Sequence, residues 1–375
     1  MGVQVATVKN IDVTPIRVPM EQPCSAPGLQ INNRDYVLVR LECDDGSKGI
    51  GFTYVGTGGA QAVASAAEEL LCPFVIGQDP QCVKAVWKAM YRATLIQGRA
   101  GLVMNGLSAI DIALWDRNAR VANLGLCKYL GGQDKDLVPA YASGGYYADS
   151  KGPAQLAAEV KGYVDRDFNA VKIKTGALGI EEEEARLTAV RDAIGPDRIL
   201  MLDIYNSWDD LGMAMRYMDM YEKFAPFWIE DPFTPDDLDN YVRLARRIRQ
   251  PLATGEFHSS SFIFKHIVES GAASIIQAEA PRCGGITEWL RIASMAAPYG
   301  VNMSPCWFHD LHVHLVPSIT NSLFVEYFPD LSILNFGKLI DQQLEIAEGG
   351  LKLPTGPGLG FNFLDEAIRE YALTT

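Results

Sequence analysis

The chain has 375 residues, of which 48% are apolar and 21% charged, and its formal net charge of −13 disfavours nucleic acids and anionic membrane surfaces as partners. The N-terminus lacks the form of a signal peptide, and no apolar run approaches the length of a membrane span. The seven cysteines are scattered without CxxC spacing, so we expect a cytoplasmic globular protein, not a disulfide or zinc scaffold.

The first 131 residues predict an α+β unit. Alternating apolar residues indicate three strands, and a helical period then indicates three helices. The expected strands cover residues 3–18, 36–43 and 48–55, and the expected helices cover residues 60–71, 80–92 and 101–121.

Two segments of this unit are expected to be loops. Residues 21–33 are rich in Pro, Gly and polar residues, and residues 56–59 read Gly-Thr-Gly-Gly. The glycine cluster lacks the spacing of a dinucleotide or nucleotide phosphate site, so a lid or a plain turn is the favoured interpretation over a phosphate cradle.

From residue 138 to residue 342, strand and helix patterns alternate. Eight strands separated by helices predict a parallel (β/α) barrel. The expected strands cover residues 138–142, 170–174, 199–203, 227–230, 252–255, 274–277, 301–304 and 323–326. The expected helices cover residues 153–164, 181–194, 209–224, 238–248, 260–270, 287–299 and 311–321. The C-terminal residues 343–375 are expected to return to the first unit.

Three acids follow successive barrel strands at intervals of one strand–helix repeat. Asp203, Glu230 and Glu256 each end an apolar strand. Equivalent strand ends of a parallel barrel meet at one rim, so the three carboxylates should lie side by side there. Three oxygen ligands without His or Cys favour Mg²⁺. The alternative is that the acids are unrelated N-caps of three helices.

Two lysines share one strand upstream of these acids. Lys172 and Lys174 are two residues apart and therefore point to the same side, into the barrel. We predict that Lys174 is a general base and that Lys172 lowers its pKa by like-charge repulsion and contacts a substrate carboxylate. An exposed pair at a strand edge is the alternative.

Together these motifs resemble the enolase superfamily, in its mandelate racemase/muconate lactonizing branch. The resemblance extends over nearly the whole chain and also includes residues 108–116 and 356–360. It implies a modified TIM barrel at 138–342 under an N-terminal α+β capping domain at 1–131 completed by 343–375. It also implies Mg²⁺-assisted removal of the proton alpha to a carboxylate, and homo-oligomers such as dimers or octamers. The motifs are Val171-Lys172-Ile173-Lys174, Leu202-Asp203, Trp228-Ile229-Glu230-Asp231-Pro232, Thr254-Gly255-Glu256 and Gly284-Gly285-Ile286-Thr287.

The third acid, Glu256, places the resemblance in the mandelate racemase subgroup, which includes acid-sugar dehydratases. The chain departs from that subgroup at two places. Glu279 and Cys306 stand where an Asp and a His are usual at the ends of the sixth and seventh strands. Tyr205 stands two residues after the first metal ligand, where Asn is usual, and Asn206 follows it.

The resemblance also implies roles for further residues. Glu326, at the end of the eighth strand, is expected to donate a hydrogen bond to the substrate carboxylate or to pair with Lys172. His309 is a candidate for the missing imidazole if Glu279 reaches it, and helix capping or packing is the alternative. The candidate substrate-binding residues are Tyr205, Asn206, Glu279, Cys306 and Arg34.

The expected function is that of a Mg²⁺-dependent lyase that converts a sugar acid into a 2-keto-3-deoxy acid. Two alternatives remain within the superfamily: a cycloisomerase of a lactone or anhydro sugar acid, and a racemase or epimerase. A third alternative is a metal-binding barrel without catalysis. The expected partner is a small carboxylate substrate, not nucleic acid or a membrane.

Overall fold

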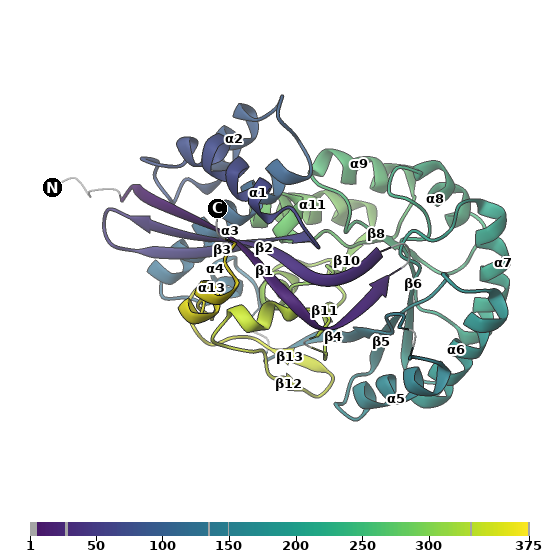
Figure 1. The fold of residues 1–375 in the computed structure, drawn as a ribbon. Helices are drawn as coiled ribbons and strands as arrows, with labels where there is room; N and C mark the ends of the chain where they lie inside the picture. Colours follow the sequence, from purple (N-terminus) through teal and green to yellow (C-terminus); the bar gives the residue numbers. More distant parts are fainter. Residues whose placement is uncertain (1–5, 27–28, 134–135, 149, 331, 374–375) are drawn as a thin grey trace.

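The structure of the chain, a computed structural model, describes residues 6–26, 29–133, 136–148, 150–330 and 332–373. A three-stranded antiparallel sheet with its helices lies against one end of a larger, mainly parallel sheet (Figure 1). The smaller part is called the cap below, and the larger part the barrel. No helix in these ranges is long and apolar enough to cross a membrane.

The cap sheet has the order β1-β2-β3. Its strands are β1 (Val8–Ala26), β2 (Leu29–Cys43) and β3 (Lys48–Gly56). The predicted loop at 21–33 is wrong for the residues that the structure describes, because β1 and β2 remain paired as far as Ala26 and Leu29. A register shift between Pro19 and Cys24 lets the ladder pass Pro23, which cannot donate a backbone hydrogen bond.

The cap helices pack on one face of this sheet. They are α1 (Ala60–Ala66), the π-helical η1 (Ala67–Leu71), the 3₁₀ turn η2 (Cys72–Phe74), α2 (Val83–Ala93) and α3 (Leu102–Val121). Helix α3 lies directly on β3, because a Cβ atom at Gly51 would come 2.0 Å from the carbonyl oxygen of Ala109. Only glycine permits this approach.

All eight predicted barrel strands are present, and the predicted fold class is confirmed. Strands β4 to β10 pair in chain order, and β11 returns to pair with β4 in parallel. Between β10 and β11, Met303 N donates to Asn321 O and Leu323 N to Met303 O, which closes the ring. The strands are β4 (Leu137–Gly144), β5 (Ala170–Lys174), β6 (Ile199–Asp203), β7 (Ile229–Glu230), β8 (Leu252–Thr254), β9 (Ile275–Ile276), β10 (Asn302–Met303) and β11 (Val325–Tyr327).

Helices surround the barrel strands, as the alternating pattern predicts. The main ones are α5 (Pro153–Val164), α6 (Ile180–Ile194), α7 (Leu211–Tyr221), α8 (Leu238–Ala245), α9 (Ser261–Ser270), α11 (Gly285–Ala296) and α12 (His309–Leu315). Shorter helical segments are α4 (Leu126–Tyr129), η3 (Glu222–Phe224), α10 (Ala280–Cys283), η4 (Ala297–Tyr299), η5 (Val316–Ser318) and η6 (Asn335–Leu339).

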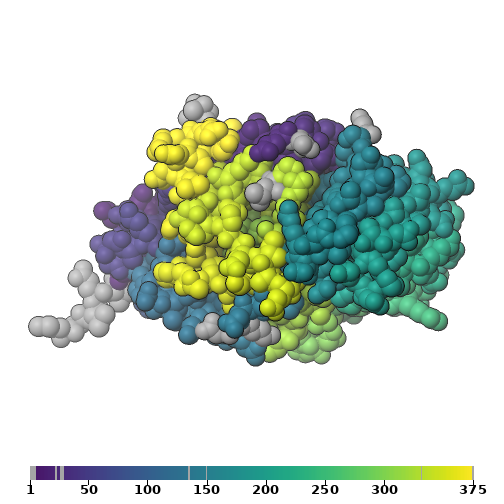
Figure 2. Space-filling model, turned by 90° about the horizontal axis from the view of Figure 1, so that it is seen from below, coloured from purple at the N-terminus to yellow at the C-terminus, as the bar shows by residue number. Residues whose placement is uncertain are grey.

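The C-terminal segment, expected to complete the cap, divides between the two parts. Strand β13 (Gly350–Lys352) pairs with β12 (Ile346–Ala347) and with β4 of the barrel. Helix α13 (Asp365–Tyr371) reaches the cap, where Leu373 N donates to Pro15 O. In Figure 2 the yellow C-terminal residues accordingly lie beside the purple first strands.

A seam of hydrogen bonds joins α3 of the cap to the start of α11. Asp111 accepts from Thr287 N at 2.9 Å and from Thr287 Oγ1 at 2.6 Å. Ser108 Oγ accepts from Gly284 N at 2.9 Å, and Trp87 Nε1 donates to Gly284 O at 2.7 Å. These buried bonds hold the cap over the carboxyl ends of the barrel strands.

Candidate active site

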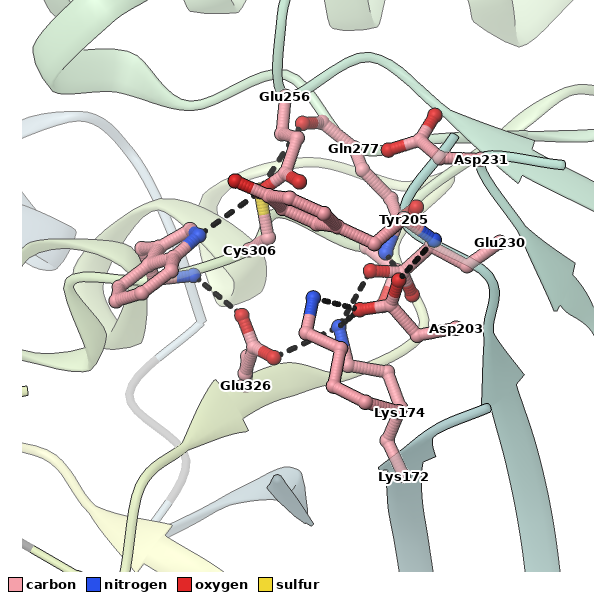
Figure 3. Close-up of polar contacts among 12 residues, drawn as sticks. Lys172, Lys174, Asp203, Tyr205, Glu230, Asp231, Glu256, Gln277, Cys306 and Glu326 are labelled. Carbon is pink, nitrogen blue, oxygen red and sulfur yellow. Dashed lines mark hydrogen bonds and ion pairs between the residues drawn. The ribbon is translucent and has the colours of Figure 1, made fainter. Parts of the chain in front are cut away.

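The predicted lysines and acids meet at the carboxyl ends of β5 to β8. Lys174 is paired in register with Asp203, and Asp203 with Glu230, while Glu256 follows β8 by two residues. Figure 3 shows both lysine side chains rising from β5 toward Asp203 and Glu230, with Glu256 beyond them. Each of these five residues is at most 5% exposed. The structure therefore brings together residues that the sequence spreads over three repeats.

Both lysines are paired with acids. Lys172 Nζ lies 2.5 Å from Glu230 Oε1, 2.7 Å from Glu326 Oε1 and 3.6 Å from Asp203 Oδ2. Lys174 Nζ lies 2.5 Å from Asp203 Oδ2. The site is thus a compact network in which two cations neutralise carboxylates from three strands, including Glu326 of β11.

The predicted effect of Lys172 on the Lys174 pKa is confirmed, but it does not set the net direction of the shift in this paired lysine. Burial lowers the pKa of Lys174, but Asp203, Tyr146 and Glu256 raise it, and the net pKa lies well above its usual value. Lys172 lowers the Lys174 pKa, as expected, but more weakly than Asp203 raises it. Like-charge repulsion alone therefore does not set this pKa, because the nearest charge is a carboxylate.

The three predicted metal ligands are suited to an oxygen-preferring cation. In the ranges that the structure describes, no three acidic, His or Cys side chains converge closely enough to hold an ion as they stand. The reason is that lysine nitrogens lie against Asp203 and Glu230. The Oε1 atom of Glu256, however, is buried without a hydrogen-bond partner, and its Oε2 accepts from Trp307 Nε1 at 2.8 Å. An all-oxygen set with an unused buried carboxylate oxygen fits Mg²⁺.

The residues that follow β6 contact both Asp203 and Lys174. Tyr205 and Asn206 both have positive φ, 49° and 60°, and Tyr205 N donates to Asp203 Oδ1 at 3.0 Å. The Tyr205 ring centroid lies 4.4 Å from Lys174 Nζ. The Oδ1 atom of Asn206 is buried without a partner. This strained turn holds Asp203 and stacks an aromatic ring on the predicted base.

Glu279 and Cys306 lie on the side of the barrel opposite β5. Both oxygens of Glu279 are buried and have no hydrogen-bond partner among the residues that the structure describes, and Arg282 Nη1 is 3.7 Å from Oε2. Burial raises the pKa of Glu279 to about 8, against the lowering effect of Arg282. Burial also raises the pKa of the Cys306 thiol well above its usual value, as do Glu256 and Glu279. Cys306 is therefore a neutral thiol, which donates to Gln277 O at 3.4 Å.

The hypothesised pair of His309 and Glu279 is not formed. His309 Nε2 lies 3.6 Å from Asp310 Oδ2, and its ring centroid is 4.6 Å from that of Tyr327. Its Nδ1 has no hydrogen-bond partner within the described ranges, and neither do the Glu279 oxygens. His309 begins α12 and is held by α12 and β11, so the structure gives it the packing position that was the alternative expectation.

Sequence reasoning missed Trp307 and Gln277. Trp307 N donates to Glu326 Oε2 at 2.6 Å while its indole binds Glu256, so one residue connects two acids. Gln277 Nε2 donates to Glu230 Oε2 at 2.7 Å. Gln277 is the last residue of a predicted strand and could have been found there. Trp307 could not, because its direction depends on its positive φ of 57°.

Arg34 reaches the same region from the cap. Its side chain is 2% exposed, and its Cζ lies 4.7 Å from the centroid of the Trp307 ring. Its Nη1 donates to Tyr54 OH, and Tyr54 stacks on Trp307 with centroids 5.4 Å apart. Arg34, Tyr54 and Trp307 thus form a layer between the cap sheet and the barrel acids.

Two family models match the chain. Residues 8–131 match the mandelate racemase/muconate lactonizing enzyme N-terminal domain, and residues 155–367 match the enolase C-terminal domain-like family. Among curated relatives, the L-talarate/galactarate dehydratase of Salmonella typhimurium is 31% identical over 90% of this chain and 83% of its own. The arabinonate dehydratase of Saccharolobus solfataricus is 32% identical over 92% of each chain. The D-galactarolactone cycloisomerase of Agrobacterium fabrum is 30% identical over 94% of this chain and 96% of its own.

Solved structures agree with this similarity over the whole length. The L-talarate dehydratase from Polaromonas sp. JS666, complexed with Mg and L-glucarate, superposes with a TM-score of 0.90 at 29% identity and covers 98% of both chains. The cap and the barrel therefore match together, in one arrangement.

Proposed function

This chain belongs to the mandelate racemase/muconate lactonizing enzyme family of the enolase superfamily, and from that premise we propose that it is a Mg²⁺-dependent sugar-acid dehydratase. The reaction removes the proton alpha to the carboxylate and expels the beta hydroxyl group, which leaves a 2-keto-3-deoxy acid. The observation that carries this proposal is the buried meeting of Lys172 and Lys174 with Asp203, Glu230 and Glu256.

Asp203, Glu230 and Glu256 are the residues that would hold the cation. Bound there, Mg²⁺ would supply the positive charge that makes the alpha proton of a carboxylate substrate more acidic. The carboxylates now paired with the lysines would then have a second cationic partner. Lys172 and Lys174 would be free to face the substrate.

Lys174 is the base in this proposal. Its neutral amine takes the proton from C2, and the C–H electron pair becomes the C1–C2 double bond of an enediolate. Lys172 and Glu326 lie 2.7 Å apart, so they can address the same substrate carboxylate, with Lys172 donating to its developing negative charge. Tyr205 keeps the Lys174 side chain in place by stacking against it.

The second half of the reaction needs a proton for the leaving group. The C3–O bond breaks as the enediolate collapses, and the oxygen departs as water once it receives a proton. Glu279 is suited to donate it, because its carboxyl group is buried opposite the lysines with both oxygens unpartnered. The enol product then takes a proton at C3 and becomes the ketone. Cys306 stays a neutral thiol throughout.

Cycloisomerisation is the second candidate, because a D-galactarolactone cycloisomerase is 30% identical over almost the whole of both chains. It begins with the same proton removal, but the oxygen expelled from C3 is the ring oxygen of the substrate. The ring opens, and this oxygen stays attached to the rest of the product, so no water is lost. Racemisation is less well supported, since a thiol occupies the place of the imidazole on the second face. A barrel without catalysis is disfavoured by the two retained lysines.

The test is a screen of sugar acids in D₂O with Mg²⁺. NMR would follow both solvent deuterium at C2 and the appearance of a 2-keto product. A dehydratase gives a 2-keto-3-deoxy acid, and a cycloisomerase gives ring opening without loss of water. Absence of C2 exchange with every acid in a broad aldonate, aldarate and lactone panel would contradict the proposal. The homo-oligomeric state and the cytoplasmic location expected from the sequence stay predictions.

A further inference from the structure

Arg34 is a buried cation without a carboxylate partner among the described residues. Its Nε donates to Ile333 O at 3.1 Å and its Nη1 to Tyr54 OH, but its Nη2 is buried and has no hydrogen-bond partner in the part of the chain that the structure describes. The neighbouring acid, Asp35, is engaged by Arg17 at 2.8 Å. Burying a guanidinium group without a counter-charge is unfavourable in free energy. We therefore expect that a bound ligand supplies the counter-charge.

The direction of Arg34 is fixed by the residues around it. On one side, it stacks on Trp307, whose indole and amide nitrogens bind Glu256 and Glu326. On the other side, Tyr146 is an electrostatic neighbour of both Arg34 and Lys174, and its ring centroid lies 5.4 Å from Lys174 Nζ. Arg34 therefore lies on the cap side of the predicted base, next to Trp307 and Tyr146.

We propose that Arg34 binds a second carboxylate of the substrate, so that the preferred substrates are sugar diacids or their monolactones and not sugar monoacids. This inference rests on the proposed function and makes its substrate class more specific. One carboxylate of the diacid lies at Lys172 and the metal ligands, and the far carboxylate meets Arg34.

The donors at Arg34 match a carboxylate. Nη2 is unused, and Tyr54 OH, which accepts from Nη1, still has its own proton to donate. A guanidinium group and a carboxylate form paired, charge-assisted hydrogen bonds that a neutral terminal hydroxymethyl group cannot reproduce. The far end of a diacid would thus supply the missing counter-charge, while a monoacid would leave the guanidinium group unpaired.

The experiment compares matched pairs of acids that differ only at the far carbon, such as galactarate and galactonate, across several configurations. The wild-type enzyme should favour the diacid of at least one pair by about 100-fold in kcat/KM, the effect of one well-formed charged contact. Arg34→Met should remove this preference, because it should lower kcat/KM on the diacid far more than on the monoacid. Arg40→Met is the matched control, because Arg40 lies on the same strand, pairs with Asp365 at the surface and is 41% exposed.

A binding measurement gives a readout independent of turnover. In the Lys174→Ala background, calorimetry with Mg²⁺ should show the diacid binding more tightly than the monoacid, and Arg34→Met should abolish the difference. Arg34→Lys keeps the charge without the paired geometry, so it should retain a reduced preference, and it serves if Arg34→Met does not fold.

The outcomes separate the two proposals. Equal use of diacid and monoacid by the wild type, or an equal loss of both in the Arg34 variants, would overturn the role of Arg34 and leave the proposed dehydratase intact. Failure of every acid to exchange its C2 proton in the wild type would instead remove the proposed function itself.

Discussion

The two sides of the barrel mouth differ in how their polar groups are satisfied. At the ends of β5 to β7, both lysines have carboxylate partners at 2.5 Å. At the ends of β8 to β10, Glu256 Oε1 and both oxygens of Glu279 are buried and find no hydrogen-bond partner within the described parts of the chain. The first side is called the lysine wall below, and the second the opposite wall.

The two walls differ in what must change before their polar groups can bind a ligand. The lysine wall is neutralised internally, so its groups must exchange partners before they act on a ligand. The opposite wall keeps unsatisfied oxygens at a cost in stability, because buried polar atoms without partners are unfavourable. Such atoms are uncommon in folded proteins, and their presence on one wall supports the proposal that a cation at Glu256 and the substrate at Glu279 supply the partners.

The largest effect should come from removing the base of the lysine wall. Lys174→Ala should abolish both turnover and C2 deuterium exchange, a loss of at least about 10²–10⁴ in rate. Product assays and NMR exchange would measure it. Lys161→Ala is the control, because Lys161 is an exposed helix lysine paired with Asp165. Exchange that persists in Lys174→Ala would reassign proton removal to the opposite wall.

Next in size is the loss of a metal ligand from the lysine wall. Glu230→Gln keeps the shape of the side chain but removes its charge. Because Glu230 is proposed as a direct ligand, this change should weaken Mg²⁺ binding by more than about tenfold, the smallest loss usual for a residue that only supports a ligand. Calorimetric titration with Mg²⁺ measures this directly. Glu269→Gln, at a half-exposed site on α9, should bind Mg²⁺ like the wild type. An unchanged affinity in Glu230→Gln would refute the ligand assignment.

A smaller effect is expected on the opposite wall. Glu279→Gln cannot donate the proton of a carboxylic acid, so kcat should fall by about 100-fold, the lower end of the range for general acid catalysis. C2 exchange should continue, because Lys174 is untouched. A variant that loses exchange and elimination together would place Glu279 in substrate binding instead of proton donation.

Asp111, a buried acid outside the barrel mouth, can be compared with the acids of the two walls. Asp111 is fully hydrogen-bonded to Thr287, yet burial raises its pKa from 3.8 to about 7. Its ionised form is disfavoured by folding, so its stabilisation is complete below about pH 4 and is lost as the pH rises to about 7. The shift corresponds to roughly 4 kcal/mol at most.

Asp111→Asn has no such titration. Its melting temperature relative to the wild type should therefore rise between pH 5 and pH 8, as measured by calorimetry at constant ionic strength. A relative melting temperature that does not change with pH would mean that Asp111 is already ionised in the folded protein.

The smallest effect is expected at His309. Its Nε2 faces Asp310 and its ring faces Tyr327, away from Glu279. His309→Asn should leave C2 exchange and elimination unchanged, as followed by the same NMR assay. Loss of exchange in this variant, with Lys174 intact, would show that the imidazole moves into the site during turnover.

The sequence predicted the site where local rules determine position. The acids 203, 230 and 256 follow apolar strands at repeat spacing, and Lys172 and Lys174 alternate into the barrel, so strand geometry alone brings them together. The roles predicted for them, as metal ligands, as the base and as the neighbour that lowers the pKa of the base, do not depend on the loop conformations.

Other features depend on distant contacts and could not be predicted. Residues 21–26 have the composition of a loop, but pairing with β2 extends them into a strand. Trp307 points at Glu256 only because of its positive φ. The Lys174 pKa rises because Asp203 is its nearest charge. The distance between Lys174 Nζ and Asp203 Oδ2 depends on how both side chains lie, which the spacing in the sequence does not determine.

The paired extension of β1 and β2 has a kinetic consequence. Ser25 N donates to Tyr147 O at 3.3 Å, so this hairpin is attached to the barrel just beyond β4. Lys172 and Lys174 are at most 5% exposed. We therefore predict that each catalytic cycle of the proposed reaction includes an opening and a closing event, and that the opening rate sets an upper limit on turnover. Between these events the enediolate is kept from bulk water, which would otherwise reprotonate it before the hydroxyl group leaves.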